Sequence, residues 1–222
     1  MHKSVLAVAS LGLLAFAPCV SAQLANAQLA GVSTFVVTSG DDTVAVERVT
    51  RTSNSLTGDL RLAGPQPQRN LHAHYVATLR PDGGASRVDV IDDMPGFFTG
   101  VLVFDGSAMA AAQHELGALN DRIRMVPPNT YPTIGTSMAL MEQLIRATHP
   151  TIGASVRIGV VNIRNGNRAA VGITRTSADS VVLACDGCMQ PNRIETIHLA
   201  VSKDGEIVGG TNPELQWVIV RR

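Results

Sequence analysis

Ser137 has the surroundings closest to a catalytic pattern in this chain of 222 residues. It lies at the centre of the pentapeptide GTSMA, with small residues before it and an apolar run after it. A serine acts as a nucleophile when a histidine takes its proton and an aspartate orients that histidine. The same residue types also begin helices, because a serine hydroxyl can accept a hydrogen bond from a free backbone N–H. Ser137 is therefore either a nucleophile or a helix cap.

The letters GTSMA resemble the sequence around the nucleophilic serine of the subtilase proteases, which implies a Ser-His-Asp hydrolase. In that family the aspartate is followed by Ser or Thr and Gly, and the histidine lies in a run similar to HGTH. This chain contains neither pattern. The family also has a proline two residues after the alanine of the motif, where this chain has Met141. We therefore predict no protease activity and assign no catalytic residue.

The residues after Ser137 have the period of an amphipathic helix. Four apolar side chains would share one face, which packs on a core or faces a ligand: Met138, Met141, Leu144 and Ile145. Glu142 and Arg146 lie one turn apart on the predicted polar side. Pro150 should end the helix, since the residue before a proline avoids helical dihedral angles. The pattern predicts a helix over about 136–148, capped by Thr136 or Ser137.

Two cysteines, Cys185 and Cys188, lie at the ends of the sequence CDGC. A four-residue turn brings its end Cα atoms within about 7 Å, a separation that a disulfide accepts. We predict a structural disulfide, because a zinc site needs two further ligands and no second CxxC is present.

His72 and His74 would point to one face of a strand, where two imidazoles could share a metal ion with His114 or a carboxylate. A solvated strand face is the commoner setting for such a pair, so we predict no metal site and keep these two as candidates. The chain has no GxxxxGK[ST], HExxH or GxSxG pattern, and nothing in it indicates a cofactor.

The N-terminus resembles an export signal, with a short polar start, an apolar run and small residues ending at Ala22. Pro18 before Cys19 does not fit a lipoprotein signal. We expect a signal peptide over 1–22 and one β-rich domain over 23–222, without a transmembrane segment, in the periplasm or outside the cell. Loss of Lys3 leaves 17 basic and 18 acidic side chains, and this balance argues against a nucleic-acid partner.

The chain also matches itself. TRTS occurs at 50–53 and again 124 residues later at 174–177, and the same spacing relates His74 to His198. After a deletion of two residues, the Asp-Gly pair at 82–83 matches the pair at 204–205. We interpret these matches as internal repeats over about 45–83 and 169–205, each an antiparallel meander whose Asp-Gly pair marks a hairpin turn.

Alternating apolar and polar residues predict about ten strands in all. The segment 107–125 stays open, because its alanines favour a helix whereas Gly117 and the flanking strands favour a hairpin. The predicted fold is mainly β: one antiparallel curved sheet or half-barrel with one central helix.

In element order and length, the predicted fold resembles the half-barrels of periplasmic lipoprotein carriers, in which a helix covers an apolar cavity. We predict a non-catalytic structural or interaction protein of the cell envelope. The alternative is a carrier or sensor of an apolar, lipid-like ligand that contacts the helix face defined above, and an unrecognised hydrolase ranks last. The sequence identifies neither a ligand nor a partner protein.

Overall fold

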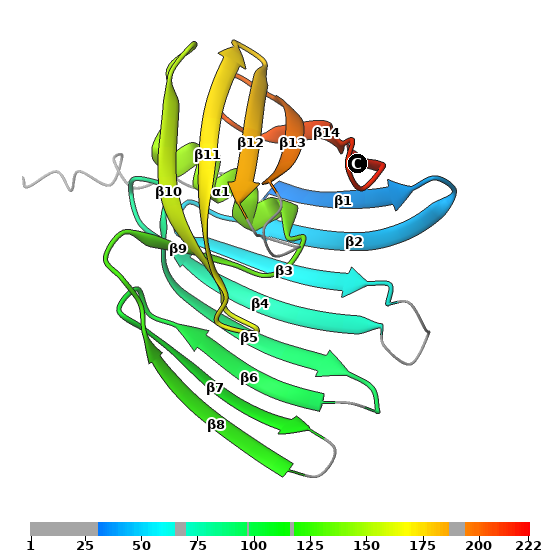
Figure 1. Cartoon of the computed structure of the whole chain (residues 1–222), viewed down its shortest axis with the longest axis vertical. Helices are drawn as coiled ribbons and strands as arrows, with labels where there is room; N and C mark the ends of the chain where they lie inside the picture. Colours follow the sequence, from blue (N-terminus) through cyan, green and yellow to red (C-terminus); the bar gives the residue numbers. More distant parts are fainter. Residues whose placement is uncertain (1–30, 65–69, 97, 116–117, 187–193) are drawn as a thin grey trace, which may run out of the picture.

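The structure is a computed structural model that describes residues 31–64, 70–96, 98–115, 118–186 and 194–222. Within these ranges the chain forms fifteen strands and one helix (Figure 1). The elements are β1 (Gly31–Ser39), β2 (Asp42–Arg51), β3 (Ser55–Leu62), β4 (Leu71–Leu79), β5 (Ala85–Met94), β6 (Phe98–Phe104), β7 (Ala108–Glu115), β8 (Ala118–Met125), β9 (Thr130–Thr133), α1 (Met138–Thr148), β10 (Ser155–Asn162), β11 (Arg168–Ser177), β12 (Ser180–Asp186), β13 (Ile194–Val201), β14 (Ile207–Asn212) and β15 (Trp217–Arg221).

All fifteen strands belong to one sheet, in the order β8-β7-β6-β5-β4-β3-β2-β1-β15-β14-β13-β12-β11-β10-β9. Neighbouring strands are antiparallel, except that β9 and β10 are parallel. The pairing of β1 with β15 joins the two halves of the chain, with Phe35 opposite Arg221 and Val37 opposite Ile219. The sheet is therefore two successive meanders joined through the first and last described strands.

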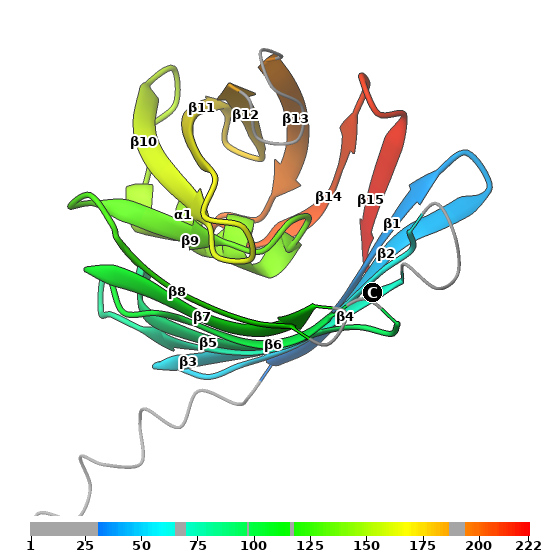
Figure 2. The same ribbon diagram turned by 60° about the horizontal axis from the view of Figure 1, so that its bottom comes forward.

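The sheet curves strongly around α1. Figure 2 shows α1 and β9 enclosed between a layer that contains β3–β8 and a layer that contains β10–β13. Strand residues alternate between the buried concave side and the outer side, as in β4, where Ala73, Tyr75 and Ala77 are buried and His74 and Val76 are exposed. The core thus lies inside the curve, and α1 packs there against β2 and β9.

The turn between β10 and β11 crosses the concave side to reach the other layer. Arg164 Nε lies 2.8 Å from Asp92 Oδ2 on β5, where Asp92 is fully buried. Arg168 donates a hydrogen bond of 2.6 Å to the carbonyl oxygen of Met125 at the end of β8. Arg124 on β8 donates one of 3.2 Å to the carbonyl oxygen of Asn165 in the turn. These contacts hold the two layers together away from the β1–β15 junction.

The prediction of a mainly β, curved single sheet with one helix is confirmed. The number of strands was underestimated, at about ten instead of fifteen. Part of the difference lies in segment 107–125, which forms the hairpin of β7 and β8: pairing with β6 outweighs the helix propensity of its alanines. Among the described residues, no helix is both long and apolar enough to span a membrane.

Two hairpins of the sheet have the same register. In the β4–β5 hairpin, Thr78 pairs with Arg87 and Leu79 with Ala85, with a register shift between the two pairs. In the β13–β14 hairpin, Ala200 pairs with Gly209 and Val201 with Ile207, with the same shift, and each residue number is 122 higher. The glycines of the two turns, at 83 and 205, both have positive φ angles, of 83° and 78°. These two turns form part of the site described next.

Candidate functional site

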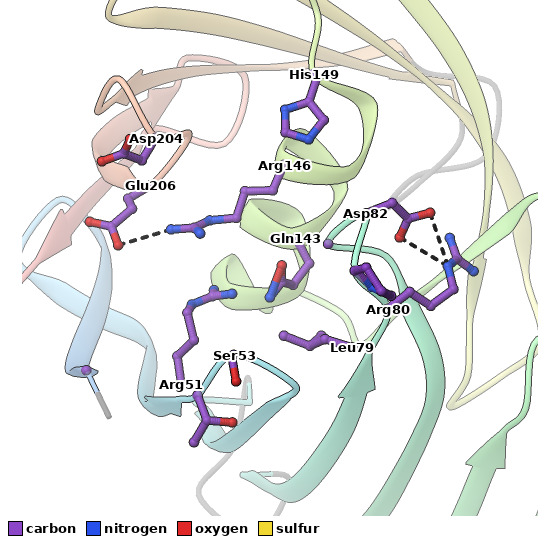
Figure 3. Close-up of a pocket in the computed structure, with 14 residues that line it drawn as sticks. Arg51, Ser53, Leu79, Arg80, Asp82, Gln143, Arg146, His149, Asp204 and Glu206 are labelled. Atoms are coloured by element: carbon purple, nitrogen blue, oxygen red, sulfur yellow. Dashed lines mark hydrogen bonds and ion pairs between the residues drawn. The ribbon is translucent and has the colours of Figure 1, made fainter. Parts of the chain in front are cut away.

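A pocket of about 380 Å³ lies beside the C-terminal half of α1 (Figure 3). Three turns surround it: those between β2 and β3, between β4 and β5, and between β13 and β14. Its volume is within the range of about 300–1,000 Å³ that is usual for small-molecule sites. The polar and charged side chains that line it include Arg51, Ser53, Arg80, Asp82, Gln143, Arg146, His149, Asp204 and Glu206.

A buried carboxylate, that of Glu142, organises the charged side chains next to the pocket. Its side chain is 1% exposed, and Oε1 lies 2.6 Å from Arg51 Nη2. Oε2 lies 2.9 Å from Arg221 Nη1 and accepts a hydrogen bond of 2.8 Å from the backbone N–H of Ile207. Glu142 thus connects α1 to β2, β14 and β15. The prediction that Glu142 lies on a polar helix face is wrong in this respect, because the sheet covers that face and supplies charged partners.

Arg146, one turn further along α1, connects this cluster to the β13–β14 turn. Its Nη2 lies 3.0 Å from Glu206 Oε1, and Glu206 Oε2 is 3.8 Å from Arg221 Nη1. Burial lowers the pKa of the Arg51 guanidinium, and the positive charges of Arg146 and Arg221 add to this effect, against the opposing effect of Glu142. The cluster of Arg51, Arg146 and Arg221 with Glu142 and Glu206 contains three positive and two negative groups.

Two buried hydrogen-bond donors at this pocket have no acceptor among the described residues. Gln143 is 2% exposed, and its Nε2 has no hydrogen-bond partner. Nε of Arg146 has none either, although it lies 3.6 Å from Glu142 Oε1, which is within ion-pair distance but too long for a hydrogen bond. A buried donor without an acceptor costs about 1–3 kcal/mol, so buried polar groups normally have partners. A ligand that brings an acceptor would remove this cost.

The far side of the pocket carries a separate ion pair. Arg80 Nε lies 3.1 Å from Asp82 Oδ1, and Asp82 also accepts a hydrogen bond of 2.8 Å from the backbone N–H of Gly84. Figure 3 shows this pair on one side of α1, and Asp204 and Glu206 on the other. Asp204 is exposed at the rim. Most charged side chains of the pocket are therefore paired with a neighbouring charge of opposite sign.

The four helix residues predicted to face an apolar ligand lie in two different environments. Met141 and Leu144 line a second cavity, of about 80 Å³, between α1 and the strands β10–β13. Met138 and Ile145 are 0% and 1% exposed and pack within the core. A cavity of this size is well below the volume usual for ligand sites.

Ser137 is the cap of α1, as one of the two sequence interpretations predicted. Its Oγ accepts a hydrogen bond of 3.2 Å from the backbone N–H of Leu140. It also donates one of 2.6 Å to Glu47 Oε1, which accepts another of 2.5 Å from the Tyr75 hydroxyl. Glu47 Oε2 accepts one of 3.0 Å from the backbone N–H of Ala139. A carboxylate, rather than a histidine, is the acceptor for this serine.

Burial raises the pKa of Glu47, and the hydrogen bonds from Ser137, Tyr75 and the first turn of the helix offset this only in part. Burial also raises the pKa of Tyr75 well above its usual value, and the neighbouring Glu47 charge adds to that effect. Tyr75 reaches Glu47 across Gly58 of β3, where a Cβ atom would lie 2.1 Å from the tyrosine ring. The group formed by Glu47, Tyr75 and Ser137 is fully buried and fixes the start of α1.

His72 and His74 both point away from the core, as predicted for neighbours on one strand face. His72 Nε2 lies 2.6 Å from Asp59 Oδ2 on β3. Among the described residues, no group of three or more His, Cys, Asp or Glu side chains could hold a metal ion. Cys185 is buried on β12, whereas Cys188 lies outside the described residues, so the disulfide remains a prediction. The proposed signal peptide, 1–22, also lies outside them.

No protein-family model and no curated protein matches the sequence. Among solved structures, the fold is similar to a DUF1089 family protein from Pseudomonas aeruginosa, with a TM-score of 0.53 and 13% sequence identity over 79% of this chain and 92% of that one. A beta-barrel-like protein of the domain of unknown function DUF1849, from Brucella abortus, has a TM-score of 0.49 and 12% identity, over 88% of this chain and 96% of that one. Neither is described as a lipoprotein carrier, so that resemblance remains a prediction. At such low identity, the chain is similar to the DUF1089 protein in fold alone.

Proposed function

We propose that this chain is an exported, non-catalytic binding domain that holds a small polar ligand in the pocket beside α1. The observation that supports this most is the buried amide of Gln143 at a pocket of about 380 Å³, because its Nε2 finds no acceptor among the residues that the structure describes. The charged groups around it, such as Arg51 with Glu142 and Arg80 with Asp82, are fixed in ion pairs. Fixed charges beside two unsatisfied donors, Gln143 Nε2 and Arg146 Nε, suit recognition of a ligand by complementary polar groups.

A structural or interaction domain of the cell envelope is a second candidate. Apolar side chains of the edge strand β8 are exposed to solvent: Leu119 by 58%, Ile123 by 80% and Met125 by 70%. On the neighbouring strands, Ile91 and Val101 pair with each other and are also more than half exposed. Exposed apolar patches of this kind often mark contact surfaces. The two functions are compatible, because the pocket and β8 belong to different parts of the sheet.

The apolar-ligand alternative has weaker support. It needs a cavity for an acyl chain beneath α1, and the cavity that Met141 and Leu144 line is about 80 Å³. Such a ligand would therefore have to displace part of the helix.

Export is part of the proposal and rests on the signal-like sequence before Gln23. N-terminal sequencing of protein recovered from the periplasm or the medium should give Gln23 as the first residue. If the chain is recovered only from the cytoplasm, with its first residues intact, the proposed export is wrong.

The binding function can be tested by native mass spectrometry of protein isolated from its own compartment. The wild type should carry an additional small-molecule mass. Ser53→Trp should lose it, because Ser53 lines the pocket and a large side chain there would fill it. Asn54→Trp, at the next residue of the same turn, is the matched control and should retain the mass, because Asn54 is exposed and does not line the pocket. Equal retention by both variants, or no added mass on the wild type, would contradict a ligand in this pocket.

A further inference from the structure

The chemistry of the pocket restricts which ligand group can bind there. Two side-chain atoms at its inner side have no hydrogen-bond partner within the described part of the chain, and both are donors: the Gln143 amide nitrogen and the Arg146 Nε. A donor is satisfied only by an acceptor, so the group that enters must present oxygen lone pairs toward both α1 residues. A cation or a hydrogen-bond donor would leave both unsatisfied.

The net charge of the surrounding cluster also favours a ligand group with acceptor oxygens. Arg51, Arg146 and Arg221 face two carboxylates, so one positive charge is left without a counter-charge. Arg51 and Arg146 both line the pocket and are largely buried, with side-chain exposures of 17% and 23%. A partly desolvated excess cation is stabilised by a nearby anion far more than an exposed one would be.

The acidic side chains of the pocket do not oppose an anion at this position. Glu206 is paired with Arg146, and Asp82 is paired with Arg80. Asp204 is exposed to solvent at the rim, where water screens its charge. Figure 3 shows Gln143 and Arg51 directed toward the same part of the pocket, between the two turns that carry these acidic residues.

We infer that the pocket binds an oxyanion, a carboxylate or phosphate group of a small molecule, through Gln143, Arg51 and Arg146. This inference rests on the proposed binding function and names the chemical class of its ligand. Arginine suits this role because its planar guanidinium presents several donors in the geometry that carboxylate and phosphate oxygens accept.

The test uses inorganic phosphate and acetate as probes, each at constant ionic strength against sodium chloride. The melting temperature of the wild type should rise with phosphate or acetate concentration and not with chloride. Gln143→Leu should weaken the apparent affinity at least about tenfold, because it removes a hydrogen bond to a charged group. Gln143→Glu, which places a negative charge in the pocket, should abolish the response.

The matched control is Gln113→Leu, the same change at a buried glutamine on β7 outside the pocket residues. It should respond to the anions as the wild type does. Gln143→Leu should fold normally, because replacing an unsatisfied buried donor with an apolar group of similar size is close to neutral. If either Gln143 variant is unfolded by circular dichroism, calorimetric titration of the other with the same anion decides the result.

Short-chain dihexanoyl phosphatidic acid distinguishes a lipid head group from a free anion. Tighter binding than inorganic phosphate would identify a phospholipid source, and equal or weaker binding a free oxyanion; both agree with the inference. Equal responses of the wild type and Gln143→Leu would overturn it. If the wild type retains a neutral molecule that Ser53→Trp loses, the inference of an oxyanion ligand is wrong but the proposed binding function still holds. If the wild type retains no ligand and responds to neither anion, both the inference and the proposed binding function are wrong.

Discussion

Gly83 and Gly205 occupy the same position in two hairpin turns, and both turns pack against Arg146 of α1. A Cβ atom on Gly83 would lie 3.5 Å from Arg146 Cβ, and one on Gly205 would lie 3.3 Å from Arg146 Cγ. In each turn the glycine N–H donates to the carbonyl oxygen three residues earlier, at Arg80 and Ser202. The helix therefore rests between two copies of one local structure that are 122 residues apart.

This equivalence supports the internal repeat, which remains a hypothesis about the whole of 45–83 and 169–205. The registers of the β4–β5 and β13–β14 hairpins agree with it. Carried back along β4 and β13, the spacing of 122 aligns His74 with Thr196 rather than with His198. Superposition of the two segments, scored by strand order and register, tests the hypothesis over their full length.

Gly205→Ala should destabilise the protein by more than the cost of its positive φ. An alanine with φ near 78° costs about 1–2 kcal/mol, and contact with Arg146 adds to this. Gly153→Ala is the matched control, because Gly153 has a φ of 80° and nothing lies within 4 Å of its added Cβ. Urea denaturation should give a larger loss of unfolding free energy for Gly205→Ala. Equal losses would show that the contact with α1 contributes nothing.

Ser137→Ala should cost about 2–3 kcal/mol of unfolding free energy. Loss of a helix cap alone costs about 1 kcal/mol, and the change also removes a hydrogen bond to the buried Glu47 carboxylate. Thr136→Val is the neighbouring control and should be close to neutral, because the buried Thr136 hydroxyl has no hydrogen-bond partner among the described residues. Denaturant melts measure both. A fluorophosphonate that labels Ser137 in the wild type would instead indicate a hydrolase.

Glu47→Gln should change how stability depends on pH. The pKa of Glu47 is raised in the folded state above its ordinary value of 4.5, so the folded protein binds this proton more tightly than the unfolded chain does. The resulting stabilisation is fully present below the unfolded pKa and is lost as pH rises through the folded pKa. The stability of Glu47→Gln relative to the wild type should therefore increase from pH 4.5 upward. A constant difference in unfolding free energy across this range would show that the Glu47 pKa is not raised.

Met138→Ala and Met141→Ala should differ in their cost. Met138 is 0% exposed and surrounded by core residues, so its truncation should cost about 2–5 kcal/mol. Met141 is half-buried beside the cavity of about 80 Å³ and loses fewer contacts. Thermal and urea unfolding of the two variants should rank Met138→Ala as the more damaging. The reverse order would mean that the cavity closes around Met141 in solution.

The predictions from sequence succeeded where the determining interactions are local. The helix start at Ser137 depends on a bond to Leu140 three residues away, and the turns at Gly83 and Gly205 depend on Asp-Gly pairs. Segment 107–125 stayed undecided because its alanines favour a helix whereas Gly117 and the flanking strands favour a hairpin; pairing with the neighbouring strand β6 decides its structure.

The candidate site was missed because its parts are distant in sequence. Glu142 contacts Arg51, 91 residues before it, and Arg221, 79 residues after it. From sequence alone, a polar residue on a helix surface is interpreted as exposed to solvent, because the sequence does not show which distant strand will cover it with a charged partner. One local signal was present: Glu142 and Gln143 lie between Met141 and Leu144, so at least one of them had to border the buried face.

The pairing of β1 with β15 sets the order in which this molecule can be completed. Phe35 and Arg221 are 186 residues apart, so β1 has its second neighbour only after β15 has been synthesised. Until then β1 is an edge strand, and the Arg221 contact with Glu142 is absent. Pairings between such distant residues form slowly. The sheet is therefore completed late, which suits the export proposed above, because a translocation channel passes an unfolded chain.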